Sequence, residues 1–245
     1  MPISQDRLPP GAALPNPRRY RWLLLDADGT LFDYDRAEAS ALAQVFEQNG
    51  LPYDPTWLPV YREVNQLLWQ RLEKKQITPD ALKLRRFELL LERIGVALPA
   101  ANFSTRYLQC LANCSELVDG AYEFLQAMTG RCQTAILTNG LQAVQRNRVE
   151  HSAIRDLVHA MIISEEIGHS KPAPEYFDAA FARLGNPAKP EVLMVGDSWS
   201  ADIVGAVRYG IDVCWFNPRR QLRPATPEIT FEVATFHDLL TVLGS

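Results

Sequence analysis

The most constraining feature of the sequence is a short apolar segment that ends abruptly in charged residues and glycine. It reads WLLLDADGT, from Trp22 to Thr30. A run of this length, apolar without alternation and followed by a turn signal, is typical of a strand buried on both faces of a parallel sheet. Segments of the same kind recur at residues 133–139, 159–164, 191–197 and 212–217. Helical patterns separate them, so we predict an α/β fold with a central parallel sheet and right-handed crossovers.

The first connection between these strands is much longer than the others. Each later connection leaves room for about one helix, whereas residues 32–118 are almost entirely helical in pattern. We therefore predict a helical subdomain at residues 35–117, inserted into a core formed by residues 20–34 and 118–245. Residues 1–19 contain five prolines and are predicted to be an extended N-terminal tail.

One helix of the insertion can be placed from its own sequence. Thr78 and Pro79 have the N-cap and N1 chemistry that begins a helix. Five apolar residues then approximate a helical stripe, namely Leu82, Phe87, Leu90, Leu91 and Ile94. The charged residues lie elsewhere on the helix, namely Lys83, Arg85, Arg86, Glu88 and Glu92. The pattern predicts one apolar face against the rest of the insertion and one solvated face.

Composition restricts the class of partner. The formal net charge is −4, so the chain offers no basic field for a polyanion, and we expect no binding to nucleic acid. No apolar stretch is long enough to span a bilayer, and we expect no membrane insertion. The four cysteines lack CxxC spacing, which favours reduced thiols in the cytoplasm. Cys110 and Cys114 are more simply small core residues than half of a metal site.

Polar side chains follow the apolar runs at the points where the strands end. They are Asp26, Asp28, Thr138, Asn139, Lys171, Asp197 and Asp202. Because the carboxyl ends of parallel strands meet at one edge of the sheet, topology assigns these side chains to the same edge, where ligands bind. Each segment alone has a simpler explanation as a turn, a helix cap or a surface lysine. Their order on successive strand ends favours a joint site.

Four carboxylates at one edge are costly unless a cation neutralises them. Hard oxygen ligands suit Mg²⁺, which also bridges to phosphate. The residue types then allow one carboxylate to remain ionised as a nucleophile and another to transfer a proton. Thr138 and Lys171 would stabilise charge on a transferred phosphoryl group. The pattern thus predicts a phosphoryl-transfer site that uses a divalent cation.

The segments DADGT, LTNG, SKP and GDSWSAD, in this order, resemble the four motifs of the haloacid dehalogenase (HAD) superfamily, and the resemblance extends from about residue 20 to the C-terminus. It implies that Asp26 is the nucleophile and Asp28 the general acid and base of a phosphatase. It also implies that Asp26, the backbone carbonyl of Asp28 and Asp197 hold Mg²⁺, with Asp202 supporting them. Thr138, Asn139 and Lys171 would bind the phosphate or orient the nucleophile. The insertion resembles a helical HAD cap.

The segments at residues 65–96 and 163–187 resemble, more narrowly, the house-cleaning pyrimidine 5′-nucleotidases of bacteria. This resemblance implies hydrolysis of nucleoside monophosphates. One departure is Gly29, where the most similar relatives are expected to carry glutamate. A small-acid or sugar-phosphate phosphatase, such as a phosphoglycolate phosphatase, remains the main alternative. A 2-haloacid dehalogenase is disfavoured because that branch does not keep Asp28, and a non-enzymatic binding module is disfavoured because every residue that the reaction needs is present.

Substrate contacts within the insertion stay open at this stage. An aromatic side chain could stack on a base while Asn65 reads its edge. Candidates are Trp57, Tyr61, Arg62, Asn65 and Trp69, with Trp199 in the last segment. Aromatic residues at helical spacing are more often core. Oligomeric state is not readable from the sequence.

Overall fold

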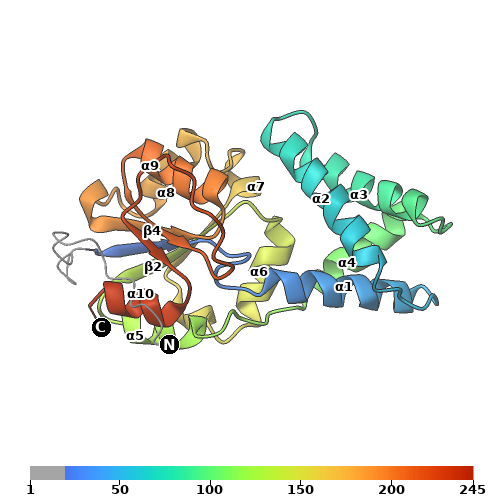
Figure 1. Cartoon of the computed structure of the whole chain (residues 1–245), viewed down its shortest axis with the longest axis horizontal. Coiled ribbons are helices and arrows are strands. Elements are labelled where there is room, and N and C mark those ends of the chain that lie inside the picture. Colours follow the sequence, from blue (N-terminus) through green and yellow to red (C-terminus); the bar gives the residue numbers. More distant parts are fainter. Residues whose placement is uncertain (1–19, 245) are drawn as a thin grey trace, which may run out of the picture.

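A computed structural model of the chain describes residues 20–244. It consists of a sheet flanked by helices and of four helices, α1–α4, that project from one side of the sheet (Figure 1). We call these parts the sheet unit and the four-helix unit. The predicted tail at residues 1–19 lies outside the described residues.

The six strands of the sheet are all parallel, in the order β3-β2-β1-β4-β5-β6. The strands are β1 (Trp22–Leu25), β2 (Gln133–Thr138), β3 (Ala160–Ile163), β4 (Val192–Gly196), β5 (Asp212–Phe216) and β6 (Phe231–Val233). All five residues of β4 are buried, as expected for a strand that is covered on both faces. The predicted α/β class with a central parallel sheet is confirmed.

Helices cover both faces of the sheet (Figure 1). On one face, α5 (Ala121–Met128) and α10 (Phe236–Val242) pack Phe124 and Phe236 against the strands. On the other, α8 (Pro174–Arg183) and α9 (Val204–Tyr209) contribute Phe177 and Ala206. The remaining helical segments of this unit are α6 (Gln142–Glu150), α7 (Ser164–Ile167), the 3₁₀ turns Arg155–Leu157 and Lys189–Glu191, and the π-helical turn Trp199–Ile203.

The hydrophobic cluster of the four-helix unit continues onto Leu141 and Val144 at the start of α6. The unit comprises α1 (Tyr34–Gln48), α2 (Trp57–Glu73), α3 (Pro79–Arg93) and α4 (Ala100–Ala112). Thr78 caps α3 by accepting a hydrogen bond from the Ala81 amide at 3.2 Å, and Pro79 is its first residue, as predicted. The predicted stripe is buried except for Ile94, which is half-buried. Arg86 was predicted to lie on the solvated face of this helix. This prediction is wrong, because Arg86 is fully buried and contacts residues of α2 and α4.

Two adjacent chain crossings, residues 31–33 and 113–118, join the two units, and we call them the junction. Phe32 and Leu117 form an antiparallel bridge. The Asp33 amide donates to the Glu116 carbonyl at 3.0 Å, and the Val118 amide donates to the Leu31 carbonyl at 2.9 Å. The path into the four helices and the path out of them are therefore bonded to each other.

Strand β6 was missed, because three residues that follow a proline-containing loop carry too little periodicity to identify. Cys110 and Cys114 are buried and free, which confirms their interpretation as core residues. Within residues 20–244, no helix has both the length and the apolar character required to cross a bilayer.

Candidate functional site

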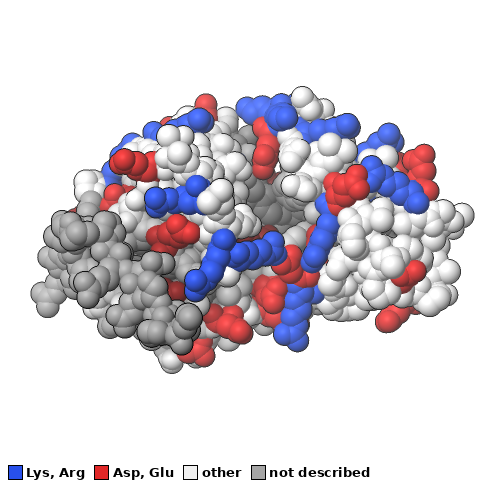
Figure 2. All heavy atoms as spheres, in the orientation of Figure 1, with Lys and Arg blue, Asp and Glu red and all other residues white. Residues whose placement is uncertain are grey.

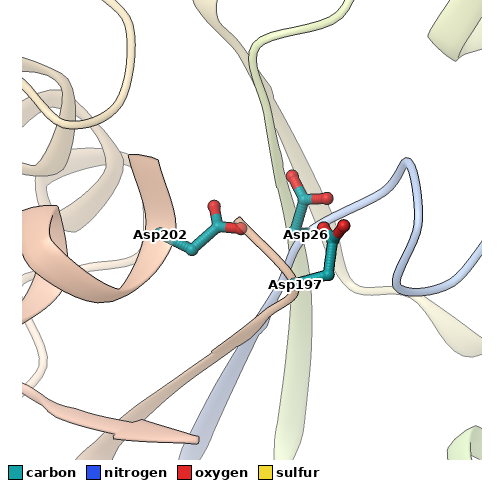
Figure 3. Close-up of side chains that lie close together, drawn as sticks. All are labelled: Asp26, Asp197 and Asp202. Atoms are coloured by element: carbon teal, nitrogen blue, oxygen red, sulfur yellow. The ribbon is translucent and has the colours of Figure 1, made fainter. Parts of the chain in front are cut away.

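Three carboxylates converge where the central strands end. Asp26 follows β1 and Asp197 follows β4, while Asp202 lies on the π-helical turn beyond β4. Each offers one oxygen atom, and these atoms lie within 4.8 Å of one another (Figure 3). The register explains this meeting: Leu25 pairs with Val195, so β1 and β4 end side by side. The predicted gathering of Asp26, Asp197 and Asp202 at one edge is what the structure contains.

Lys171 is the cation of this cluster. Its ammonium donates to Asp26 Oδ1 at 2.5 Å, to Asp202 Oδ1 at 2.6 Å and to the Leu137 carbonyl at 2.6 Å. The side chain is 1% exposed, so its alternative interpretation as a surface lysine is wrong. Burial works to lower the pKa of Lys171, but the carboxylates of Asp202 and Asp26 outweigh burial and raise it. The ammonium therefore stays charged.

One ammonium does not balance three carboxylates. Burial raises the pKa of Asp26 well above its ordinary value; Lys171 opposes this rise, while Asp202 and Asp197 add to it. Burial and then the Asp202 carboxylate raise the pKa of Asp197 to about 7. Buried carboxyl groups that are costly to ionise next to one another are stabilised as anions by a divalent cation, and their hard oxygen atoms are the donors that such a cation prefers.

Asp202 has both oxygens occupied within the protein. Oδ1 accepts from Lys171, and Oδ2 accepts from the Ser198 amide at 3.0 Å. Ser198 in turn caps the π-helical turn, because its hydroxyl accepts from the Ala201 amide at 3.3 Å. Asp202 thus fixes the lysine and the turn, while Asp26 and Asp197 each offer an oxygen to the shared cluster.

Thr138 and Asn139 lie at the end of β2, and both are engaged locally. The hydroxyl of Thr138 accepts from the Gly140 amide at 2.9 Å. The side chain of Asn139 donates to the Lys171 carbonyl at 2.8 Å and accepts from the Lys171 amide at 2.9 Å. Asn139 was predicted to bind substrate, but its amide group is committed to the Lys171 backbone. Its evident task here is to place that lysine.

Asp28 lies apart from the three converging carboxylates and faces α6. Its two oxygens accept hydrogen bonds from Gln145 and Arg148. Sequence reasoning missed these two residues. The available signal was their spacing of three residues on a helix that follows the LTNG segment, which places both on the face that carries the buried Leu141 and Val144.

Gly29 allows the loop between Asp28 and Thr30 to approach Asp197 closely. Its φ of 84° lies in the left-handed region, and a Cβ at this position would lie 2.5 Å from Asp197 Oδ2. A side chain here would therefore strain the backbone and displace a carboxylate of the site. Glycine, rather than the glutamate expected in similar proteins, is what this loop conformation requires.

A cavity of about 630 Å³ opens beside Asp28 and Asp197. The four-helix unit contributes Tyr34 and Asp35 to its wall, and the loop after β5 contributes Arg219, which forms an ion pair with Asp35. The surface is hollowed between the two units, with acidic and basic side chains on both sides of the hollow (Figure 2). A small ligand at the carboxylates would therefore touch both units.

The proposed aromatic contacts are mostly core. Tyr61 is fully buried, and the Trp57 ring lies 4.6 Å from the Phe46 ring. Trp199 packs edge-on against Trp215 with ring centres 5.0 Å apart. Trp69 packs among apolar residues of α2 and α3.

The polar candidates of α2 are also engaged within the protein. Arg62 pairs with Glu38 at 2.6 Å and with Asp35 at 3.2 Å. Asn65 accepts from Arg86 at 3.3 Å and donates to the Tyr34 hydroxyl at 3.5 Å. Tyr34 thus connects the buried Asn65 to the cavity wall.

The chain is similar to known proteins over most of its length. The sequence model of the haloacid dehalogenase-like hydrolases matches residues 20–210. The HAD-hydrolase YfnB of Bacillus subtilis is 33% identical over 229 residues, which cover 93% of this chain and 97% of that protein. The pyrimidine 5′-nucleotidases YjjG of Escherichia coli and PynA of Streptococcus pneumoniae are each 32% identical over 225 residues, covering 92% and 91% of this chain and 98% and 95% of theirs. A crystal structure of YfnB bound to magnesium, which reveals interdomain movement, matches with a TM-score of 0.87 at 32% identity and covers 93% of this chain and 100% of its own.

Proposed function

Because the chain belongs to the haloacid dehalogenase-like hydrolases, we propose that it is a Mg²⁺-dependent phosphatase that cleaves nucleoside 5′-monophosphates with a pyrimidine base. The observation that carries the proposal is the contact of Lys171 with Asp26 inside a ring of carboxylates. This contact brings together, at the carboxyl ends of the strands, the proposed nucleophile Asp26, the ammonium of Lys171 and the proposed ligands of a metal ion.

The donor set fits Mg²⁺. Asp26 and Asp197 would hold the ion together with the backbone carbonyl of Asp28, while Asp202 supports them through Lys171 and Ser198. When bound, the ion neutralises the carboxylates and offsets charge on the phosphoryl oxygens. The magnesium-bound structure of the related YfnB supports this assignment.

Two aspartates have separate tasks in the reaction: Asp26 attacks phosphorus, and Asp28 transfers protons. An oxygen of Asp26 bonds to phosphorus while the bond from phosphorus to the ester oxygen breaks, and Asp28 gives the leaving oxygen its proton. Water then bonds to phosphorus, the bond to Asp26 breaks, and Asp28 takes the proton of the water. Lys171 holds Asp26 in place, and Lys171 and Thr138 offset the developing charge on the phosphoryl group.

The four-helix unit acts as a cap in this proposal, with residues 35–117 as its extent. Its contribution of Tyr34 and Asp35 to the cavity wall supports a role in substrate choice. The cavity volume of about 630 Å³ lies within the range that accommodates small ligands. The nucleotidase activity named for the relatives YjjG and PynA favours a pyrimidine nucleotide.

A substrate panel tests the proposal. UMP, dUMP and dTMP are compared with AMP, phosphoglycolate and sugar phosphates, with and without EDTA. We expect Mg²⁺-dependent release of phosphate, with the highest kcat/KM for the pyrimidine nucleotides. Equal rates across the panel would refute the substrate assignment, and halide release from 2-haloacids in EDTA would refute the phosphatase assignment. Phosphate release by Asp26→Asn at the wild-type rate would indicate a contaminating enzyme or another nucleophile.

A further inference from the structure

Two side chains of α6 hold the carboxylate of Asp28, and the reaction described above assigns them no role. Gln145 donates from Nε2 to Asp28 Oδ2 at 2.5 Å, and Arg148 donates from Nη1 to Asp28 Oδ1. Both are buried, whereas the Asp28 side chain is 27% exposed and lines the cavity. Asp28 is therefore held from within the protein and open on the side where a ligand would lie.

Arg148 also contacts both chain crossings of the junction. Its Nε donates to the Cys114 carbonyl at 2.8 Å, and its guanidinium carbon lies 4.4 Å from the centre of the Phe32 ring. A guanidinium presents its donors in a rigid planar fork. A displacement of either crossing would therefore move the donor that holds Asp28.

The polar groups of this pair are not explained by packing. Among the described residues, Nη2 of Arg148 and Oε1 of Gln145 are buried without a hydrogen-bond partner, which is unfavourable for both groups. Gly140 leaves the space that Gln145 occupies, because a Cβ there would lie 2.2 Å from Gln145 Nε2. The contact that the two side chains share in this position is the one with Asp28.

We propose that Gln145 and Arg148 are positioning residues that orient the Asp28 carboxyl toward the ester oxygen. Arg148 also couples the orientation of this carboxyl to the position of the junction. The inference rests on the proposed phosphatase function, in which Asp28 gives its proton to the leaving oxygen as the bond from phosphorus to that oxygen breaks. A carboxyl that can rotate away loses the short approach that proton transfer requires.

The dependence on the leaving group tests this role independently of nucleotide specificity. Benzyl phosphate releases an alkoxide that needs a proton, whereas p-nitrophenyl phosphate releases a stable phenolate that does not. The ratio kcat/KM covers the steps up to release of this group. For Gln145→Met we expect kcat/KM for benzyl phosphate to fall roughly 10- to 100-fold, since a positioned acid contributes roughly 10²- to 10⁴-fold, and kcat/KM for p-nitrophenyl phosphate to stay near wild type.

A matched control lies on the same helix. Arg146 pairs with Glu166 at the surface and does not contact Asp28, so Arg146→Met should leave both ratios unchanged. Arg148→Lys keeps the charge but lacks the planar fork whose two fixed nitrogen atoms donate to Asp28 and Cys114. We expect it to show the same selective loss and, in addition, faster hydrogen exchange at the junction amides of Asp33 and Val118. Gln145→Met should leave that exchange unchanged.

The outcomes separate the two levels of inference. If the wild-type protein releases phosphate from neither ester and from no compound of the substrate panel, the phosphatase function fails, and the positioning role fails with it. If the wild-type protein cleaves both and the variants lose both equally, the residues are merely structural and only the positioning role is overturned. Unchanged junction exchange in Arg148→Lys would overturn the coupling.

Discussion

Lys171 in the sheet unit and Arg86 in the four-helix unit are both 1% exposed, yet their charges are accommodated in opposite ways. The ammonium of Lys171 donates to three oxygens, two of which belong to carboxylates. The guanidinium of Arg86 makes two hydrogen bonds of 3.3 Å, to the neutral groups of Tyr61 and Asn65. Its Nε and Nη2 have no partner within the part of the chain that the structure describes.

Aromatic rings surround Arg86, and the nearby carboxylate of Glu38 accepts its hydrogen bond from Arg62 instead. The centres of the Phe87 and Tyr107 rings lie 4.9 Å and 5.1 Å from the guanidinium carbon of Arg86, and such contacts stabilise a cation less specifically than a carboxylate does. At the carboxyl ends of the strands, by contrast, the charges of Lys171, Asp26 and Asp202 hold one another in position. We therefore expect the sheet edge to be sensitive to substitution and the core of the four-helix unit to be tolerant.

Asp26→Asn should give the largest effect. We expect kcat for phosphate-ester hydrolysis to fall at least about 10⁴-fold, because an amide cannot attack phosphorus. Circular dichroism should show an intact fold, since the two side chains have nearly equal volumes. Steady-state kinetics with p-nitrophenyl phosphate measures the loss, and a fall of less than tenfold would place the nucleophile elsewhere.

Lys171→Met tests the paired cation. Without the ammonium, the carboxylates of Asp26 and Asp202 remain buried and unneutralised, so we expect the free energy of unfolding of the metal-free protein to fall by roughly 3–5 kcal/mol. Urea unfolding followed by tryptophan fluorescence measures the change. A loss below about 1 kcal/mol would mean that these carboxylates are already protonated in the metal-free fold.

Metal binding should stabilise the protein in a pH-dependent way. The pKa of Asp197 rises from 3.8 to about 7 on folding. The folded state therefore binds this proton more tightly than the unfolded chain, so the metal-free protein loses stability as the pH rises from about 4 to about 7. We expect Mg²⁺ to bind the ionised carboxylate and to reverse this loss.

The measurement is the melting temperature at two pH values. With Mg²⁺ at 100 times its Kd we expect a rise of roughly 5–10 °C at pH 8, and a smaller rise at the same concentration at pH 5. Asp197→Asn should abolish most of the response. Equal shifts at the two pH values would contradict the assignment of this carboxylate.

Arg86→Met should give the smallest effect and is the counterpart of Lys171→Met. An apolar side chain of similar length replaces a buried cation that lacks a carboxylate hydrogen bond. We expect the free energy of unfolding to change by no more than about 1 kcal/mol, or to rise. A loss as large as that of Lys171→Met would show that the aromatic surroundings hold the charge as firmly as carboxylates do.

The meeting of the carboxylates could be predicted from the sequence, because it follows from the order of parallel strands. Once the apolar runs are recognised as neighbouring parallel strands, the residues that follow them must meet, and Asp26 and Asp197 do so although 171 positions separate them. The tertiary roles of individual side chains were less accessible. Asn139 before Gly140 is typical of a turn, and its two hydrogen bonds to the Lys171 backbone are seen only in the folded chain.

Burial of charge was the hardest property to predict. Arg86 was placed away from the apolar stripe of α3, yet it is buried because α2 and α4 close over a second side of that helix. Gln145 and Arg148 reach Asp28 across more than a hundred positions; their spacing places them on one face of α6, but no local pattern identifies Asp28 as the partner of that face. Periodicity identifies one buried face of a helix but not the number of neighbours that the helix will have.

The bonded crossings of the junction also bear on how such a protein could diversify. Asp33 and Glu116 are hydrogen-bonded neighbours, so the sheet unit closes on itself whatever the length of chain between them. Insertions whose two ends lie close together are the ones that a host domain tolerates. Helices of another size could therefore replace α1–α4 between the two crossings, provided that they keep the Cys114 carbonyl for Arg148 and an apolar surface for Leu141 and Val144.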